Sequence, residues 1–302
     1  MNTLYTIRLI FLFMVQIIVA PHAGFCFGVK RAINIAEQSS DLSRQGRKVF
    51  TMGPLIHNPQ EVDRLRSQGV ELLISEDSLK RGDTVIIRSH GIPPQKERHL
   101  RALGINVIDA TCPYVKAVHE AVMKLSKEGY FVVLVGEKNH PEVIGTLGYL
   151  QEVGGKGVVV ENRDDLKAVL SKDKVGIVAQ TTQNEHFFKE VVGEIVLWAK
   201  EVKVINTICN ATSERQEDVY ELAPHVDVMI VIGGKNSGNT RRLYEISKNL
   251  NPKSYHIETA QELCGEWFEG TKKIGITAGA STPDWIIREV VEKIEKMCFS
   301  KV

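Results

Sequence analysis

Three cysteines of this 302-residue chain stand at matching places of an internal repeat. NVIDATC, ending at Cys112, and KVINTIC, ending at Cys209, both place Val-Ile and then Asp or Asn before the cysteine. His140 of VVLVGEKNH and Ser237 of MIVIGGKNS each lie 28 residues beyond the cysteine of their copy, and Cys26 begins a looser third copy. Three thiolates at one centre could hold a zinc ion with an open fourth position, or an iron-sulfur cluster with one free iron. The spacing does not choose between them.

The repeat also supplies polar side chains that would surround this centre. They are His57 and His90 in the first copy, His140 and Thr181 in the second, and Ser237, Asn239 and Ser281 in the third. Histidine, hydroxyl and amide donors together predict a pocket for a small anion such as a phosphate ester. Glu142, two residues after His140, is the carboxylate beside this set and is predicted to be a proton donor.

Other cysteines and short motifs indicate what the chemistry is not. Cys264 and Cys298 follow no predicted strand and are predicted to be core residues, since free cysteine is usually buried. The sequence has no CxxC pair, which argues against a zinc ribbon or a ferredoxin-type cluster. GGKNSGNT lacks the P-loop spacing, and no GxGxxG follows a strand, so the electrons of a redox reaction would come from outside.

The elements that must position these residues alternate between strand and helix patterns. Such alternation predicts an α/β fold with small parallel sheets, whose ligands lie beyond the carboxyl ends of the strands. Three units, at 14–105, 106–201 and 202–302, are expected to surround a pseudo-threefold axis. Helices are predicted to begin near Pro93 and Pro94, Asn184 and Pro283, and fourth strands near Val70–Ile74, Val158–Val160 and Ser254–Ile257.

The N-terminus allows two interpretations. Residues 9–20, LIFLFMVQIIVA, resemble the apolar part of a secretory signal behind Arg8, but are too short for a membrane span, which needs about 20 residues. A buried strand is favoured, because Ile17 to Val19 are β-branched and lead into a turn, and because cleavage near Ala20 would delete a strand of the repeat. Translation starting at Met14 would make residues 1–13 a spurious or disordered extension.

Composition excludes several classes of protein. With 38 Lys and Arg against 37 Asp and Glu, the net charge of +1 argues against a nucleic-acid binder or a polybasic membrane binder. A hydrophobic content of 43% is that of an ordinary globular protein. Five cysteines in a chain of this length do not suggest a disulfide scaffold.

Longer motifs, in a fixed order along nearly the whole chain, carry a family resemblance. They are HAGFCFGVKRA (22–32), LIHNPQEV (55–62), RSHGIPP (88–94), DATCPYV (109–115), NHPEVIGTLG (139–148), AQTTQ (179–183), NTICNAT (206–212), GKNSGNT (234–240) and AGASTPDW (278–285). Through these motifs the chain resembles the 4-hydroxy-3-methylbut-2-enyl diphosphate reductases, the terminal enzymes of the non-mevalonate isoprenoid pathway.

The resemblance implies a trefoil of three α/β units around a 4Fe-4S cluster held by Cys26, Cys112 and Cys209, with one iron free for the substrate hydroxyl. It implies removal of that hydroxyl with two electrons and protons, giving isopentenyl and dimethylallyl diphosphate. A ferredoxin or flavodoxin would donate the electrons, in the cytoplasm. One unit is expected to close over the substrate. The diphosphate would be held by His57, His90, His140, Ser237, Asn239 and Ser281, while Thr181 would order the hydroxyl and a water, and Glu142 would donate protons.

Two departures and three alternatives accompany this resemblance. The N-terminal extension is one departure, since members of the family begin close to the first strand, which supports Met14 as the start. Gly238 stands where the family often carries a second serine, which puts one hydroxyl contact in doubt, although a backbone N–H could serve. The alternative enzyme is another three-cysteine 4Fe-4S dehydratase such as quinolinate synthase. A redox-sensing protein with an exposed cluster and a zinc hydrolase are the other two.

Overall fold

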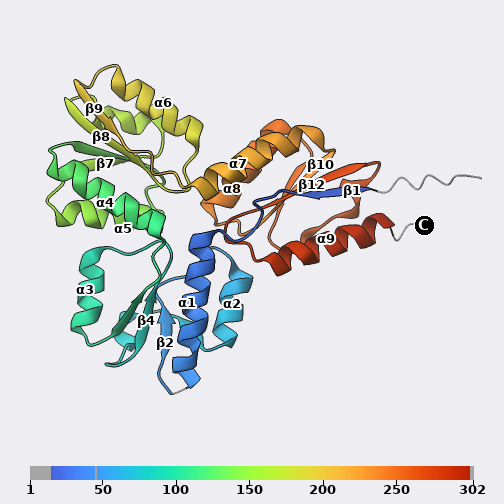
Figure 1. Ribbon diagram of the computed structural model, residues 1–302, viewed down its shortest axis with the longest axis horizontal. Coiled ribbons are helices and arrows are strands. Elements are labelled where there is room, and N and C mark those ends of the chain that lie inside the picture. The colour runs from blue at the N-terminus through green and yellow to red at the C-terminus, as the bar shows by residue number, and fades with distance from the viewer. Residues whose placement is uncertain (1–14, 45, 300–302) are drawn as a thin grey trace, which may run out of the picture.

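The chain forms three four-stranded parallel sheets, each covered by helices on both faces (Figure 1). The structure is a computed structural model that describes residues 15–44 and 46–299. Figure 1 shows the three units spread around a common centre, with β1 and α9 both in the third unit. The predicted α/β class with small parallel sheets is confirmed.

The first sheet has the strand order β3-β2-β4-β5. Its strands are β2 (Val49–Thr51), β3 (Val70–Leu72), β4 (Thr84–Ile87) and β5 (Asn106–Asp109), and its helices are α1 (Phe27–Arg44), α2 (Pro59–Ser67) and α3 (Pro94–Ala102). Ile86 of β4 packs in the cluster with α1 and α2, whereas Val85 and Ile87 pack in the cluster with Leu100 of α3. This alternation buries the sheet on both faces, as is usual for parallel strands.

The second and third sheets repeat this arrangement. The second, β7-β6-β8-β9, consists of β6 (Phe131–Val135), β7 (Gly157–Val160), β8 (Lys174–Ala179) and β9 (Glu201–Val204), with α4 (Pro113–Lys127) and α5 (Pro141–Glu152) on one face and α6 (Glu185–Val196) on the other. The third, β1-β12-β10-β11, consists of β1 (Gln16–Val19), β10 (Val228–Ile232), β11 (Ser254–Ile257) and β12 (Lys273–Ala278), with α7 (Asn210–Leu222) and α8 (Gly238–Leu250) facing α9 (Asp284–Phe299) across it.

Local predictions agree with the observed elements. The three fourth strands are β3, β7 and β11, and α3, α6 and α9 begin at or next to the predicted residues. Asn184 caps α6, because its side chain accepts a hydrogen bond from the Phe187 N–H at 3.0 Å. The strand interpretation of the apolar N-terminal run is confirmed for Gln16–Val19, which pairs with β12, but its predicted burial is wrong, because β1 is an edge strand whose residues are exposed or half-buried. The proposed extension 1–13 and the start at Met14 lie outside the described residues.

The strand before each cysteine belongs to a different unit from the one that the predicted boundaries give it. β5 pairs with β4 of the first sheet, β9 with β8 of the second, and β1 with β12 of the third. The helix after each cysteine instead packs on the next sheet. The boundary at 105/106 therefore cuts β5 from its sheet, and that at 201/202 falls within β9. A sequence repeat shows the order of the elements, but it does not show which strand an edge strand pairs with. We place each cysteine where the chain passes from one unit to the next.

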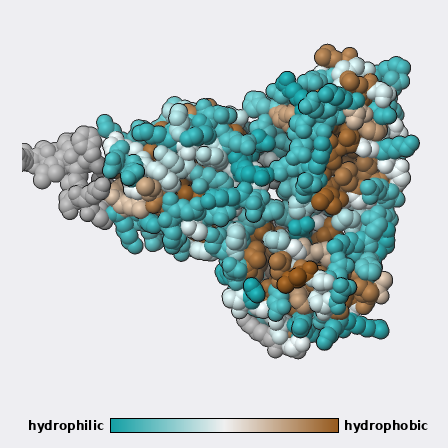
Figure 2. All heavy atoms as spheres, turned by 180° about the vertical axis from the view of Figure 1, so that it is seen from behind, coloured by the Kyte–Doolittle hydropathy of each residue, from teal (hydrophilic) through white to brown (hydrophobic). Residues whose placement is uncertain are grey.

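The hydropathy of the rear surface differs among the three units. Figure 2 shows hydrophobic side chains gathered over the first and second units on the rear face, while the third unit is mostly hydrophilic there. Within residues 15–44 and 46–299, no helix is both long and apolar enough to cross a membrane.

Candidate active site

One pocket lies where the carboxyl ends of the strands of all three sheets meet. The loops after β2 and β4, after β6 and β8, and after β10 and β12 reach it, and these are the two central strands of each sheet. All the residues predicted to form the site line this pocket, namely Cys26, His57, His90, Cys112, His140, Glu142, Thr181, Cys209, Ser237, Asn239 and Ser281. The fold thus brings together residues from every part of the repeat.

The three cysteines stand at the N-termini of three helices. Cys112 and Cys209 are the N-cap residues of α4 and α7, and Cys26 directly precedes α1, where its carbonyl accepts a hydrogen bond from the Lys30 N–H at 2.9 Å. A Cβ atom on Gly28 would lie 2.5 Å from Cys112 Sγ and 3.9 Å from Cys26 Sγ, so these two sulfur atoms lie beside the same glycine. Helix N-termini favour the thiolate form, which is the form that binds metals.

The charge around the cysteines is balanced by local donors and one buried cation. Burial raises the pKa of Cys112 and raises that of Cys209 to about 11, while backbone N–H groups at the helix starts act in the opposite direction. Thr212 lies within hydrogen-bond distance of Cys209, at 3.0 Å from Oγ1 to Sγ. Arg215 is buried, which lowers its pKa, whereas the neighbouring thiolates of Cys26 and Cys209 would raise that pKa. Thiolates here would have a counter-charge within the protein.

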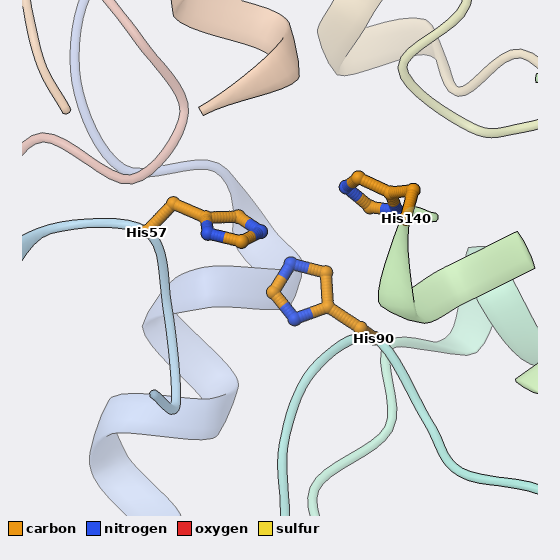
Figure 3. Close-up of side chains that lie close together, drawn as sticks. All are labelled: His57, His90 and His140. Carbon is orange, nitrogen blue, oxygen red and sulfur yellow. The ribbon is translucent and has the colours of Figure 1, made fainter. Parts of the chain in front are cut away.

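Three histidines lie close together and form a second wall of the pocket (Figure 3). The ring centroids are 4.5 Å apart for His57 and His90, 5.4 Å for His90 and His140, and 5.6 Å for His57 and His140. His140 Nδ1 accepts a hydrogen bond from the Glu142 N–H at 3.2 Å, so the proton of the neutral ring is on Nε2. Nε2 of His57 and Nδ1 of His90 are buried without a hydrogen-bond partner among the described residues.

These histidines are neutral near pH 7. Burial, as the main cause, lowers the pKa of His57 and that of His90, and lowers that of His140 to about 3. Repulsion between the rings and the charge of Arg88 add to this effect for His90 and His140. One nitrogen of each ring lies within 4.8 Å of the others, so the cluster by itself could bind a metal ion or donate hydrogen bonds to an anion.

The third wall of the pocket favours the anion. Ser237 caps α8, where its Oγ accepts a hydrogen bond from the Thr240 N–H at 3.3 Å, and the N-terminus of this 13-residue helix opens on the pocket. Both polar atoms of the Asn239 side chain are buried without a partner among the residues described. Ser281 Oγ donates a hydrogen bond to the carbonyl oxygen of His57 at 3.2 Å, which links the third unit to the first.

Gly238 makes room for an acidic side chain from the second unit. A Cβ atom at this position would lie 3.0 Å from Oε1 of Glu137, and Gly238 itself lines the pocket with its backbone. Glu137 also forms an ion pair with Arg241 of α8 at 2.8 Å. The departure from serine at Gly238 thus coincides with a contact between two units.

Glu142 and Thr181 form a buried pair. The carboxylate accepts hydrogen bonds from the Thr181 N–H and from Thr181 Oγ1, each at 2.7 Å. Burial raises the pKa of Glu142 to about 7, although both hydrogen bonds oppose the increase. A carboxyl group with this pKa holds or releases a proton near neutral pH, as a general acid must.

Sequence reasoning missed several residues around the pocket. Arg88 lies beside the histidines and Arg215 beside the cysteines, yet neither was singled out. Arg88 directly precedes Ser89 and His90 in the motif RSHGIPP, which is a signal that could have pointed to it. Arg215 had no such signal, because a buried arginine on a helix is indistinguishable in sequence from an exposed one. Cys264 and Cys298 are outside the pocket and are half-buried, so their prediction as core residues holds only in part.

A family model described as LytB protein matches residues 17–295. The chain belongs to the LytB family. A relative from Aquifex aeolicus (strain VF5), a 4-hydroxy-3-methylbut-2-enyl diphosphate reductase, is 70% identical over 285 residues, which are 94% of this chain and 98% of the relative. A LytB-family relative of the same name from Geobacter sulfurreducens is 47% identical, over 93% of this chain and 97% of its own.

Two solved structures match this member of the LytB family. One, described as (E)-4-hydroxy-3-methyl-but-2-enyl diphosphate reductase, the terminal enzyme of the non-mevalonate pathway, is 70% identical, with a TM-score of 0.72, over 94% of this chain and 100% of its own. The other, the E-1-hydroxy-2-methyl-but-2-enyl-4-diphosphate reductase from Plasmodium falciparum, is 29% identical, with a TM-score of 0.85, over 92% and 87%. The family resemblance seen in the sequence motifs is confirmed.

Proposed function

We propose that this protein reduces (E)-4-hydroxy-3-methylbut-2-enyl diphosphate to isopentenyl diphosphate and dimethylallyl diphosphate. The reaction takes up two electrons and two protons, breaks the allylic C–O bond and releases water. One observation carries the proposal: a single pocket joins three thiols, an anion-binding wall and a buried carboxyl group with a pKa near 7. The relatives that carry this activity in their names match nearly the whole chain.

The cysteines suit an iron-sulfur cluster. Cys26, Cys112 and Cys209 would hold one 4Fe-4S cluster, since three thiols at helix N-termini line the same pocket and a buried arginine balances their charge. Gly28 fits this assignment, because a side chain there would meet Cys112 Sγ. When bound, such a cluster supplies the electrons and a Lewis-acidic iron for the substrate oxygen.

The diphosphate end of the substrate would lie against the anion-binding wall. His57, His90 and Asn239 have buried polar atoms without a partner within the described part of the chain, and a phosphate oxygen would satisfy them. The N-terminus of α8 would add backbone N–H groups, with the hydroxyls of Ser237 and Ser281 beside it. These contacts would fix the tail and so position the allylic hydroxyl.

Glu142 would supply the protons, and Thr181 would orient both Glu142 and the substrate hydroxyl. Both residues are almost completely buried, at 2% and 5% exposure, so water reaches them only through the pocket. Exclusion of water would protect the allylic intermediate from side reactions. The proposal includes an external electron donor of ferredoxin or flavodoxin type and a cytoplasmic location. The anion-binding wall and the buried Glu142–Thr181 pair favour the reductase over quinolinate synthase or a sensor, whereas the three-histidine cluster is a feature that a zinc hydrolase would share.

Anaerobic purification with iron and sulfide analysis, followed by an assay on the allylic diphosphate with a reduced electron donor, tests the proposal. We expect about four irons and four sulfides per chain and formation of both products. The Cys112→Ser variant should lose the cluster absorbance and the spin-resonance signal of the reduced state. Cys264→Ser, outside the pocket, is the matched control and should retain both. A full cluster signal in Cys112→Ser, or no turnover by the cluster-containing protein, would contradict the proposal.

A further inference from the structure

Arg88 carries a charge for which the rest of the described chain offers no partner. Within residues 15–44 and 46–299 its side chain makes no hydrogen bond or ion pair, and its Nε atom is buried. Most other arginines near the pocket are paired; Arg241, for example, lies 2.8 Å from Glu137. A guanidinium group does not lose its proton in proteins, so a half-buried and unpaired one calls for an anion from outside.

The position of Arg88 places that charge beside the histidine wall. Arg88 follows β4 directly and precedes Ser89 and His90. Its guanidinium lies against the turn at Gly53, where φ is +78° and a Cβ atom would be 2.8 Å from Nη1. Four residues beyond this turn, the same segment carries His57. Arg88 thus contacts the segment that carries His57, and it belongs to the segment that carries His90.

The electrostatics of the histidines agree with this placement. The charge of Arg88 lowers the pKa of all three rings, and for His57 it is the largest cause after burial. The charge of Arg241 acts in the same direction on His57 and His140, whereas the charge of Glu137 opposes it at His57. Glu137 is paired with Arg241, whereas Arg88 has no carboxylate partner among the described residues.

The charge of Arg88 affects whether the three histidines bind a metal cation or an anion. Three imidazole nitrogens within 4.8 Å of one another are a ligand set that zinc and similar divalent cations use. A fixed positive charge nearby repels a divalent cation and attracts a phosphate-type anion, and both effects are strong where water is excluded. We infer that Arg88 is the specificity-determining residue that makes the three-histidine cluster bind a diphosphate and reject a divalent metal ion. This inference deepens the proposed function and rests on it for the substrate class.

Two probes on the untagged, cluster-containing protein test the inference by isothermal titration calorimetry: inorganic pyrophosphate and Ni²⁺. Arg88→Gln should lose about tenfold or more in pyrophosphate affinity, because it removes a fixed positive charge near the rings, and should gain one Ni²⁺ site. Arg88→Lys keeps the charge and should still exclude Ni²⁺. Arg98→Gln removes an exposed arginine that is paired with Glu152 and should behave as the unaltered protein does.

A double variant tests whether the Ni²⁺ site gained by Arg88→Gln is formed by the histidines. Arg88→Gln combined with His90→Ala should lose the Ni²⁺ site again. The inference is overturned if Arg88→Gln binds pyrophosphate normally, if it gains no Ni²⁺ site, or if Arg88→Lys takes up Ni²⁺ as readily as the glutamine variant does.

A measurement on the unaltered protein covers the case in which Arg88→Gln does not fold. Without pyrophosphate, the unaltered protein should show no Ni²⁺ binding that the His90→Ala substitution abolishes, and such binding would overturn the inference. None of these readouts requires turnover. A protein that behaves as expected here but does not reduce the allylic diphosphate would contradict the proposed function and leave the role of Arg88 intact.

Discussion

A carboxyl group in a dry pocket keeps its proton to higher pH than one in water, and Glu142 shows the size of this effect. Its pKa lies near 7 because burial outweighs two hydrogen bonds from Thr181 that favour the charged form. The residue type was visible in the sequence, but its usefulness as an acid comes from its surroundings.

Turnover should therefore fall as the pH rises through about 7, where Glu142 loses the proton that it donates. Glu142→Gln should lower the single-turnover rate by about 100-fold or more and remove this pH limb, with the cluster absorbance unchanged. Glu152→Gln, on the same helix but on the surface, is the control and should keep the normal profile. Normal turnover in Glu142→Gln would exclude that residue from the mechanism.

The histidine wall predicts that anion binding takes up protons. The pKa values of His57, His90 and His140 are lowered by burial in the free protein, so the rings are neutral at pH 7. A bound diphosphate raises these pKa values, so pyrophosphate affinity should decrease as the pH rises. Calorimetry in two buffers of different ionisation enthalpy measures the uptake. His140→Gln should reduce it, His99→Gln on the surface of α3 should not, and buffer-independent heats would contradict the prediction.

At the scale of elements, each cysteine is placed by a strand that ends and a helix that begins on the next sheet. This crossing leaves little room at the start of α1, where Gly28 lies beside Cys112 Sγ. The motif around Cys26 is therefore a packing requirement between two units as well as a local helix start.

Gly28→Ala should impair cluster assembly while the sheets remain folded, because its Cβ would lie 2.5 Å from Cys112 Sγ. Iron content and far-ultraviolet circular dichroism measure the two effects. The control is Gly193→Ala in α6, where an added Cβ meets nothing within 4 Å. It should stabilise the protein by about 0.5–1 kcal/mol, since alanine favours a helix more than glycine does. Normal iron content in Gly28→Ala would show that the contact is easily relieved.

At the scale of the whole molecule, contacts between side chains join the three units. The first unit meets the third through hydrogen bonds from Ser281 to His57 and from Trp285 to Glu61. The second meets the third through the exposed pair Glu137–Arg241, beside a second hollow that Gly238 also lines, and through Ser213 with Glu185 and His186 with Tyr220. We expect the pocket to open at this hollow, because residues of both the second and the third unit line it.

Glu137→Gln should speed the release of product by removing an ion pair between these units. The pair is partly exposed, so its loss is worth at most about 1 kcal/mol, or up to about fivefold in the release rate. Stopped-flow measurement of isopentenyl diphosphate release tests this. Asp173→Asn breaks an exposed pair with Lys200 far from the pocket and should leave the rate unchanged. An unchanged rate in Glu137→Gln would locate the opening elsewhere.

The sequence by itself determined the α/β class, the helix starts, the fourth strands, the family and every residue predicted to line the pocket. It could do so because strand ends and helix caps are local signals, and parallel strands bring their carboxyl ends to one edge. Only the tertiary structure decided which sheet each cysteine-bearing strand joins, that Gly238 lies beside Glu137, and that Arg88 has no hydrogen-bond or ion-pair partner among the residues that the structure describes. These properties depend on burial and pairing between segments far apart in the chain, which no local pattern records.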